Sequence, residues 1–219
     1  MNLEEYRKKY KIKGEEKPVG WLCIDEATEK LYPKQEPKHY ATILKYSLGG
    51  EDPLDGVSMY KSETQQSHNH FVSYGMSNLY YDEESLGTEY SKWGFEFTFR
   101  LAPFEEDKGE PKWVVSLMQN LARYVFESGN WFEEYHFIPA NGPIRLETET
   151  EITALAFIQD PELKKIDTPH GEVQFLQIVG ITSSEYEKLK LNPTKEEAKK
   201  LLDKLQKDNP LLITDLNRK

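Results

Sequence analysis

Cysteine is almost absent from this sequence of 219 residues, which contains only Cys23. A single cysteine excludes an internal disulfide and any site built from several thiolates. Long apolar runs are missing too. The sequence contains no run of about eighteen apolar residues, the length that a helix needs to span a bilayer. Residues 1–17 also lack the apolar core of an export signal. The sequence therefore predicts a cytoplasmic protein with no membrane partner.

Motifs for nucleotides, cofactors and catalysis are also missing. There is no GxGxxG fingerprint, and Gly49-Gly50 is not followed in register by the lysine and serine or threonine of a phosphate-binding loop. Residues 75–79, GMSNL, lack the second glycine of a nucleophile elbow. Cys23 lies in an apolar run, which is typical of a small core residue and not of a nucleophile. We therefore predict no cofactor and no catalytic residue.

Basic residues are outnumbered, because 28 lysines and arginines stand against 38 aspartates and glutamates, and the formal net charge is −10. Such a chain repels phosphate backbones, which argues against nucleic acid as a direct partner. It would attract a basic protein, although acidic surfaces also occur on proteins that bind nothing basic. Charge alone leaves both alternatives open.

Aromatic residues, in contrast, are plentiful, with 13 Tyr, 10 Phe and 4 Trp. They supply the buried area for a core that needs neither disulfides nor a structural metal. Residues 94–101, GFEFTFRL, alternate between apolar and polar and predict a strand with one packed and one polar face. Residues 171–182 are apolar on both faces, as in a central strand. Shorter strands are expected at 71–74 and 211–216, whereas residues 48–60 are rich in turn formers.

Helical patterns lie between these strands. One helix ends before Pro33. A second, over residues 111–128, carries apolar residues at steps of four. A third begins with a capping box of Thr194 and Glu197. These elements predict an α+β fold, with residues 1–219 forming a single domain in which a mixed β-sheet packs against helices.

The pair His68 and His70 raises the question of a metal site, because residues two apart on an extended chain project to the same face. A zinc site needs three or four ligands, and the remaining histidines are isolated in sequence: His39, His136 and His170. The alternative is that His70 opens a strand and bonds locally, with His68 in the preceding loop. We predict no metal site.

Glu133, Glu134, Tyr135 and His136 follow the second helix and combine acids, a phenol and an imidazole. They are the only group that we consider for catalysis, as a hydrolase-type site. Proximity in sequence does not establish the geometry of a nucleophile and its base. The residues alone therefore indicate an acidic, aromatic-rich binding domain.

Six segments, taken in order and spread from about residue 21 to residue 216, resemble the Suppressor of fused family. They are LGGEDPLDGVSMY (48–60), HFVSYGMSNLY (70–80), GFEFTFRL (94–101), LMQNLARYVFESGN (117–130), IDTPHGEVQFLQIVGIT (166–182) and LLITDL (211–216). Larger animal members have two lobes. The chain resembles the N-terminal lobe, as free-standing bacterial members do.

The resemblance implies a non-enzymatic protein-binding module. Animal members sequester a zinc-finger transcription factor of the Hedgehog pathway and hold a short segment of it as an added strand between the lobes. Bacterial single-lobe members are often inferred to be immunity proteins that neutralise toxins. For this chain we therefore expect a protein partner, for which a basic toxin is one candidate, and a constitutive scaffold protein is the alternative.

The resemblance also suggests binding residues. Tyr124 stands at a position that resembles a partner-contacting tyrosine of the animal proteins, and His136 replaces the acidic contact twelve positions later. Trp131, with Glu133 and Glu134, completes the candidate partner-binding set. Tyr124 could instead be a core aromatic, and Trp131 and Phe132, which follow the end of the helix, could be a lid on the core instead of an exposed hot spot. The family is not known for metal catalysis, so the resemblance favours a scaffold role for the histidine pair.

Two modes of binding are compatible with this reading. An exposed sheet edge could accept an extended segment of the partner as an added strand. The acidic surface could instead cap the basic active-site cleft of a nuclease toxin by charge complementarity. The net charge of −10 favours the second mode for a bacterial member.

Overall fold

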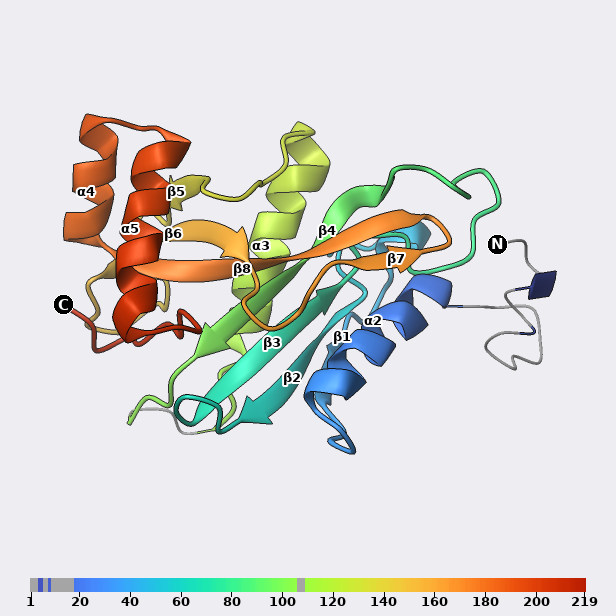
Figure 1. Ribbon diagram of the computed structural model, residues 1–219, viewed down its shortest axis with the longest axis horizontal. Coiled ribbons are helices and arrows are strands. Elements are labelled where there is room, and N and C mark those ends of the chain that lie inside the picture. Colours follow the sequence, from blue (N-terminus) through green and yellow to red (C-terminus); the bar gives the residue numbers. More distant parts are fainter. Residues whose placement is uncertain (1–3, 6–7, 9–17, 106–108) are drawn as a thin grey trace.

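The computed structural model describes residues 4–5, 8, 18–105 and 109–219; the charged segment before residue 18 lies mostly outside the described part. The described strands are β1 (Lys38–Ala41), β2 (Gly56–Ser62), β3 (His68–Tyr74), β4 (Tyr90–Leu101), β5 (Phe137–Pro139), β6 (Ile152–Gln159), β7 (Ile166–Thr168) and β8 (Gly171–Thr182). They form one sheet in the order β1-β2-β3-β4-β8-β6-β5, with β7 paired to β8 (Figure 1). Because β4 and β8 run parallel while the other neighbours are antiparallel, the sheet is mixed, as predicted.

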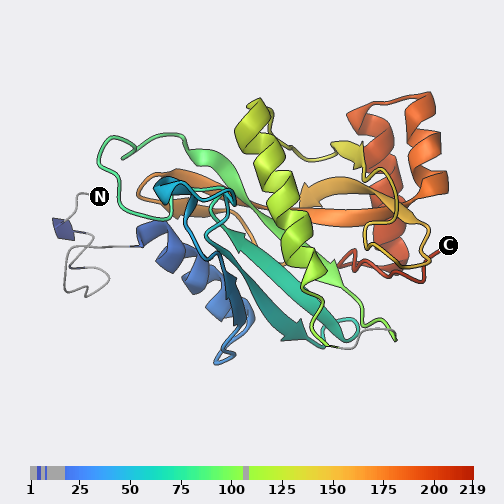
Figure 2. The same ribbon diagram turned by 180° about the vertical axis from the view of Figure 1, so that it is seen from behind.

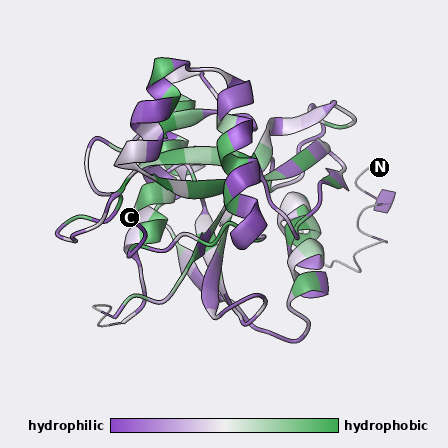
Figure 3. Cartoon of the chain, turned by 60° about the vertical axis from the view of Figure 1, so that its left-hand side comes forward, coloured by the Kyte–Doolittle hydropathy of each residue, from purple (hydrophilic) through white to green (hydrophobic). Residues whose placement is uncertain are grey.

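Helices cover both faces of this sheet. The helix α3 (Trp113–Ser128) lies on one face, and the opposite face carries α2 (Val19–Leu31), α4 (Ser183–Leu191) and α5 (Lys195–Asp208), as Figures 1 and 2 show from the two sides. Hydrophobic residues gather in the strands and on the inner sides of the helices, while the outer turns of the helices are hydrophilic (Figure 3). This is the single-domain α+β architecture that the sequence predicts.

The main core lies between the sheet and α3. Phe97 and Phe99 of β4 pack there with Met118 and Val125 of α3, all of them fully buried. Gly129 ends α3 in the left-handed conformation, with φ of 73°, and its N–H bonds the carbonyl of Val125. Such a glycine satisfies the last carbonyls of a helix without steric cost. The apolar steps of four in residues 111–128 are thus confirmed as the buried stripe of a core helix.

Several other expectations are confirmed. β8 is a central strand between β4 and β6. The helix α2 ends at Leu31, two residues before Pro33. Cys23 is buried on α2 as a small core residue. Among the described helices, none combines the length and the apolar character that crossing a bilayer requires.

Other expectations are wrong. Residues 211–216 do not form a strand, because Thr214 makes only an isolated parallel bridge to Leu101. The turn formers of residues 48–60 end at Asp55, and β2 follows them. His68 does not lie in a loop but is the first residue of β3. In each case the presence or absence of pairing with a neighbouring strand decided the outcome, and sequence periodicity does not report such pairing.

The capping box was assigned to the wrong helix. At α5, Thr194 does accept a hydrogen bond from the N–H of Glu197, but the carboxylate of Glu197 bonds Lys200. The complete box lies at α4, a helix that we did not predict, where Thr182 and Glu185 bond reciprocally. Each cap stabilises its helix start by satisfying N–H groups that have no partner within the helix.

Candidate functional site

The turn after α3 places one aromatic side chain in the core and its neighbour at the surface. Phe132 is buried and stacks on Phe157 of β6, with ring centroids 4.3 Å apart. Trp131, which precedes it, is 53 % exposed. The alternative of a lid therefore holds for Phe132 and not for Trp131.

Tyr124 reaches the same surface from the last turns of α3. Its ring lies 5.6 Å from that of Phe132, and its side chain is 49 % exposed. Of the two alternatives for Tyr124, a core aromatic or a surface residue, the structure shows the second. Large aromatic side chains that remain half exposed on a rigid helix and turn are typical components of protein-binding surfaces.

Beside Trp131 the surface is hollowed into a groove of about 710 Å³, which we call the aromatic groove. Its floor is the irregular start of β4, where the pairing with β8 shifts register between Tyr90 and Phe95. The groove is lined by Tyr90, Lys92, Trp93, Gly94, Phe95, Trp131, Phe132, Glu133, Glu134, Tyr135, Gln174, Leu176 and Lys195. The indole N–H of Trp93 is buried here without an acceptor among the described residues.

Charged groups of opposite sign balance one another in this groove. Glu133 forms an ion pair with Lys195, and its other carboxylate oxygen accepts a hydrogen bond from the indole N–H of Trp131 at 3.3 Å. The hydrogen bond that Lys195 donates to Glu133 is the main cause that lowers the pKa of Glu133. Glu134 instead turns toward β6, where its Oε1 accepts a bond from the N–H of Gln159 at 3.1 Å. The two adjacent glutamates therefore have different roles, one at the surface and one bracing the fold.

His136 lies next to this groove and is not among its lining residues. Its Nδ1 accepts a hydrogen bond from the N–H of Glu133 at 3.2 Å, and its Nε2 lies 3.8 Å from the carboxylate of the same residue. Burial and the nearby Lys195 lower the pKa of His136. No hydrogen bond joins His136 to a described serine, threonine or cysteine side chain. The cluster thus places an imidazole beside a carboxylate that is already paired with Lys195.

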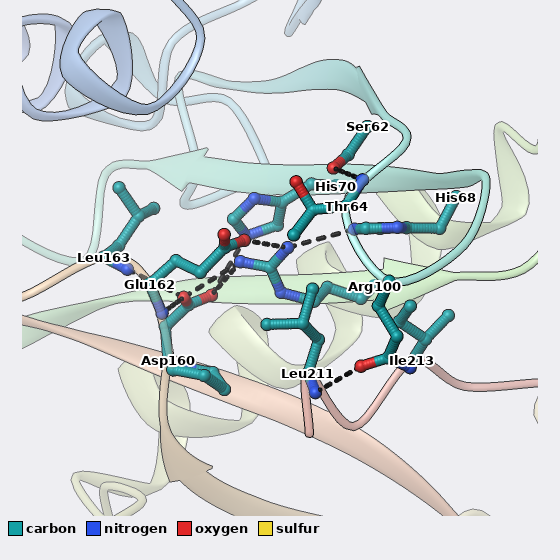
Figure 4. A network of polar contacts seen from close by, with 12 residues as sticks. Ser62, Thr64, His68, His70, Arg100, Asp160, Glu162, Leu163, Leu211 and Ile213 are labelled. Carbon is teal, nitrogen blue, oxygen red and sulfur yellow. Dashed lines mark hydrogen bonds and ion pairs between the residues drawn. The ribbon is translucent and has the colours of Figure 1, made fainter. Parts of the chain in front are cut away.

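The histidine pair lies on the opposite side of the sheet from α3, inside a buried polar network (Figure 4). Arg100 of β4 is at the centre of this network: its NH1 donates to Nε2 of His68 at 3.0 Å, and its NH2 to Asp160 at 3.0 Å. His70 bonds Asp160 through Nε2 at 3.0 Å and Tyr32 through Nδ1 at 2.7 Å. Nδ1 of His68 bonds the carbonyl of Gln66. Both ring nitrogens of His68 and both of His70 therefore have a hydrogen-bond partner.

These contacts make both histidines part of the scaffold. His68, which we expected in a loop before the strand, also takes part in the buried network through its bond with Arg100. Among the described residues, no group of three or more His, Cys, Asp or Glu side chains is arranged to hold a metal ion. Sequence reasoning missed Arg100 and Asp160, which are fully buried. The alternation in β4 correctly placed Arg100 on the polar face, but whether that face meets water depends on the segments that cover it.

A second buried acid was also missed. Glu96, on the same face of β4, is fully buried and accepts hydrogen bonds from the hydroxyls of Ser73 and Ser77 and from the N–H groups of residues 75–77. These donors fix the turn that follows β3. The segment that resembled the family motif, HFVSYGMS, is thus held in shape by a carboxylate from the neighbouring strand.

Comparisons with known proteins agree with this architecture. The family model for Suppressor of fused protein matches residues 50–219. The human Suppressor of fused homolog is 40 % identical over 176 residues, covering 76 % of this chain but 36 % of its own length, and the mouse homolog gives the same values. The chain thus spans about a third of the curated relatives that it matches.

Solved structures show the same similarity in three dimensions. A chain in the Sufu–Fu complex crystal structure superposes with a TM-score of 0.83 at 34 % identity, covering 92 % of this chain and 91 % of that one. Drosophila Suppressor of Fused gives 0.81 at 33 % identity, covering 92 % of this chain and 51 % of its own. A homolog from Neisseria gonorrhoeae shares the fold, with a TM-score of 0.60 at 16 % identity and coverage of 91 % and 94 %. The chain therefore belongs to the Suppressor of fused family.

Proposed function

We propose that the chain is a non-enzymatic protein-binding module that acts in the cytoplasm and sequesters a protein partner at the aromatic groove. The observation that carries this proposal is the half-exposed Trp131 at the groove, with the half-exposed Tyr124 beside the buried Phe132. Aromatic anchors next to a pocket dominate the binding energy of protein interfaces.

Docking of side chains into the groove accounts for these features better than addition of a strand. Among the described strands, the edges of the sheet are β1, with four residues, and β5 and β7, with three residues each; the last residue of β5 is Pro139. Short edges and prolines discourage pairing with a further strand. A similar chain was crystallised in the Sufu–Fu complex, which supports protein binding as the general activity.

The test is a pull-down from source lysate with the purified chain as bait, followed by mass spectrometry. We expect one stoichiometric partner with the wild-type chain and its loss with Trp131→Ala and Tyr124→Ala together. The matched control is Leu146→Ala, which removes another exposed apolar side chain, 84 % exposed, outside the aromatic groove. Equal capture by the double variant would show that the partner binds elsewhere.

The finer proposal is that the partner is a basic toxin and that the chain is its immunity protein. The net charge of −10 supports a basic partner. Because the lysines and glutamates of the groove balance, this excess charge acts over the whole surface and would speed the encounter of the two proteins. Raising the salt concentration should then lower the association rate far more than it raises the dissociation rate. An association rate that is indifferent to salt, or a partner that is no toxin, would leave a scaffold as the function.

A further inference from the structure

A second hollow, of about 440 Å³, lies between α2 and β1, away from the aromatic groove. We call it the α2–β1 pocket. It is lined by Trp21, Asp25, Thr28, Glu29, Gln35, Glu36, Pro37, His39, Ser58 and Tyr60. No residue of this set lines the aromatic groove, so the two sites can be changed independently.

The helix α2 builds one wall of this pocket. Trp21, Asp25 and Glu29 follow at steps of four and therefore share one face of the helix. The floor is rigid, because Thr28 and Tyr60 are buried and joined by a hydrogen bond of 3.0 Å. A pocket with such a floor keeps its shape before any ligand arrives, which lowers the entropy cost of binding.

Loop residues close the pocket on the side of β1. The side-chain amide of Gln35 bonds both the N–H and the carbonyl of Lys61 in β2, at 2.7 and 3.0 Å. Lys38, the lysine of β1, forms an ion pair with Glu110, which does not line the pocket. The wall that carries Glu36 is thus fixed to the sheet, and no lysine or arginine is among the residues that line the pocket.

Three carboxylates line the pocket, those of Asp25, Glu29 and Glu36. Asp25 accepts a hydrogen bond from the hydroxyl of Tyr74 at 3.0 Å, and Glu29 accepts one from the N–H of Lys34 at 3.1 Å. Among the described residues, none forms an ion pair with Asp25, Glu29 or Glu36. Burial raises the pKa of Asp25 because it disfavours the charged carboxylate, and a cation placed in the pocket would compensate this half-buried charge.

Aromatic rings complete the lining. The ring of Trp21 stacks on that of the buried Tyr74, with centroids 4.4 Å apart. The imidazole of His39 also contacts the ring of Trp21, with centroids 5.0 Å apart and an angle of 57° between the two rings. Burial lowers the pKa of His39, so this ring adds no positive charge at neutral pH. Aromatic faces attract ammonium groups through their quadrupoles, tryptophan most strongly.

From these features we infer that the α2–β1 pocket binds the ammonium group of a lysine side chain from a protein partner. The carboxylates supply the charge, while the apolar stem of the lysine packs on Trp21. That the lysine belongs to a protein rests on the proposed function; that the ligand is an ammonium group does not. The pocket is a second contact point, separate from the aromatic groove.

The test is a titration of the ¹⁵N-labelled full chain, observed by NMR through the indole N–H signals of its tryptophans. The probes are two blocked glycine peptides, one with a central lysine and one with Nε-acetyl-lysine, which is neutral. We expect the Trp21 signal, assigned by comparison with Trp21→Phe, to shift saturably with the lysine peptide only. Propylammonium chloride serves as a third probe for a free amine.

Asp25→Asn removes the charge and retains an oxygen that can accept the bond from Tyr74. It should weaken binding of the lysine peptide by about tenfold, because it removes a half-buried charge from a cation site. The matched control is Glu26→Gln, on the next residue of α2, which is exposed and does not line the pocket. This variant should bind as the wild-type chain does.

Three outcomes would overturn the inference. They are equal shifts with the acetylated peptide, unchanged affinity in Asp25→Asn, and binding of propylammonium without binding of the lysine peptide, which would assign the pocket to a free amine. Loss of the protein partner in the Trp131 and Tyr124 variant tests the aromatic groove alone. The two proposals can therefore fail separately.

Discussion

His70 Nε2 lies 3.0 Å from Asp160 Oδ2, and both side chains are completely buried. The same carboxylate accepts hydrogen bonds from Arg100 and from the hydroxyl of Thr98. Burial by itself would raise the pKa of Asp160, but His70, Arg100 and the N–H of Leu163 outweigh it and hold the pKa well below its usual range. Asp160 is thus an anion in the interior, and it shares Arg100 with Glu162, whose carboxylate lies 2.9 Å from NH1 of Arg100.

The first prediction concerns this buried pair. Asp160→Asn should lower the free energy of unfolding by up to about 3–5 kcal/mol, because the buried Arg100 keeps only the partly buried Glu162 as a carboxylate partner. The substitution also weakens the acceptor that His70 and Thr98 share. Chemical denaturation measures the change. The control, Glu187→Gln, removes an exposed ion pair with Lys190 and should leave the unfolding midpoint unchanged. A loss in Asp160→Asn as small as that of the control would mean that the network contributes nothing to stability.

The second prediction concerns pH. Burial lowers the pKa of His70 to about 4, with Arg100 acting in the same direction. The ordinary pKa of histidine is about 6.5, so between these values the unfolded chain takes up a proton that the folded chain does not. The stability that depends on neutral His70 is therefore complete above pH about 6.5 and declines as the pH falls toward 4.

Urea denaturation at several pH values between 7.5 and 4.5 checks this dependence. His70→Gln should be less stable than the wild-type chain at neutral pH but should lose less stability over this range. The other histidines with lowered pKa, such as His39 and His136, contribute to both proteins alike. Equal slopes in the two proteins would show that His70 is not kept neutral by the fold.

The third prediction separates two adjacent aromatic residues. Phe132→Ala should lower the free energy of unfolding by about 3–5 kcal/mol, because it empties a site that packs on Phe157 in the core. Trp131→Ala, at the exposed neighbour, should stay within about 0.5 kcal/mol of the wild-type chain. Thermal or chemical unfolding measures both. A strongly destabilised Trp131→Ala would mean that its loss of partner binding reports unfolding.

The fourth prediction concerns Glu96. Glu96→Gln replaces a carboxylate oxygen by an amide NH₂ facing donors that include Ser77 and the N–H of Gly75. Leaving buried donors without an acceptor should cost about 1–3 kcal/mol in the free energy of unfolding. Faster hydrogen exchange at residues 75–77 would locate the effect in the turn after β3. The control is Glu89→Gln on the exposed approach to β4.

The elements that could be predicted from the sequence are those whose burial follows a regular period. The apolar steps of α3 and the uniform apolar character of β8 each specify an element with little reference to the rest of the chain. β2 and α4 were missed because neither has a strong period. The order and spacing of the family segments indicated the overall arrangement more fully than any local pattern did.

In the candidate site, too, the sequence predicted the positions of residues along the chain but not their exposure. The sequence placed Tyr124 on a helix and Trp131 after its end, but exposure depends on which neighbour fills the core, and Phe132 fills it here. The pocket lined by Asp25 and His39 could not be predicted, because it joins a helix to an edge strand that only the pairing of β1 with β2 positions.

The sequence by itself determined the family, the mixed α+β sheet, the excess of acidic charge and the polar face of β4. The charge and the polar face can be read from composition and local periodicity, whereas the family and its mixed sheet follow from the order and spacing of segments along the whole chain. Tertiary structure alone decided that Arg100 on that face meets Asp160 and not water, and that Asp25 meets aromatic rings. Such encounters join residues far apart in sequence, and their energies depend on burial, which no local pattern encodes.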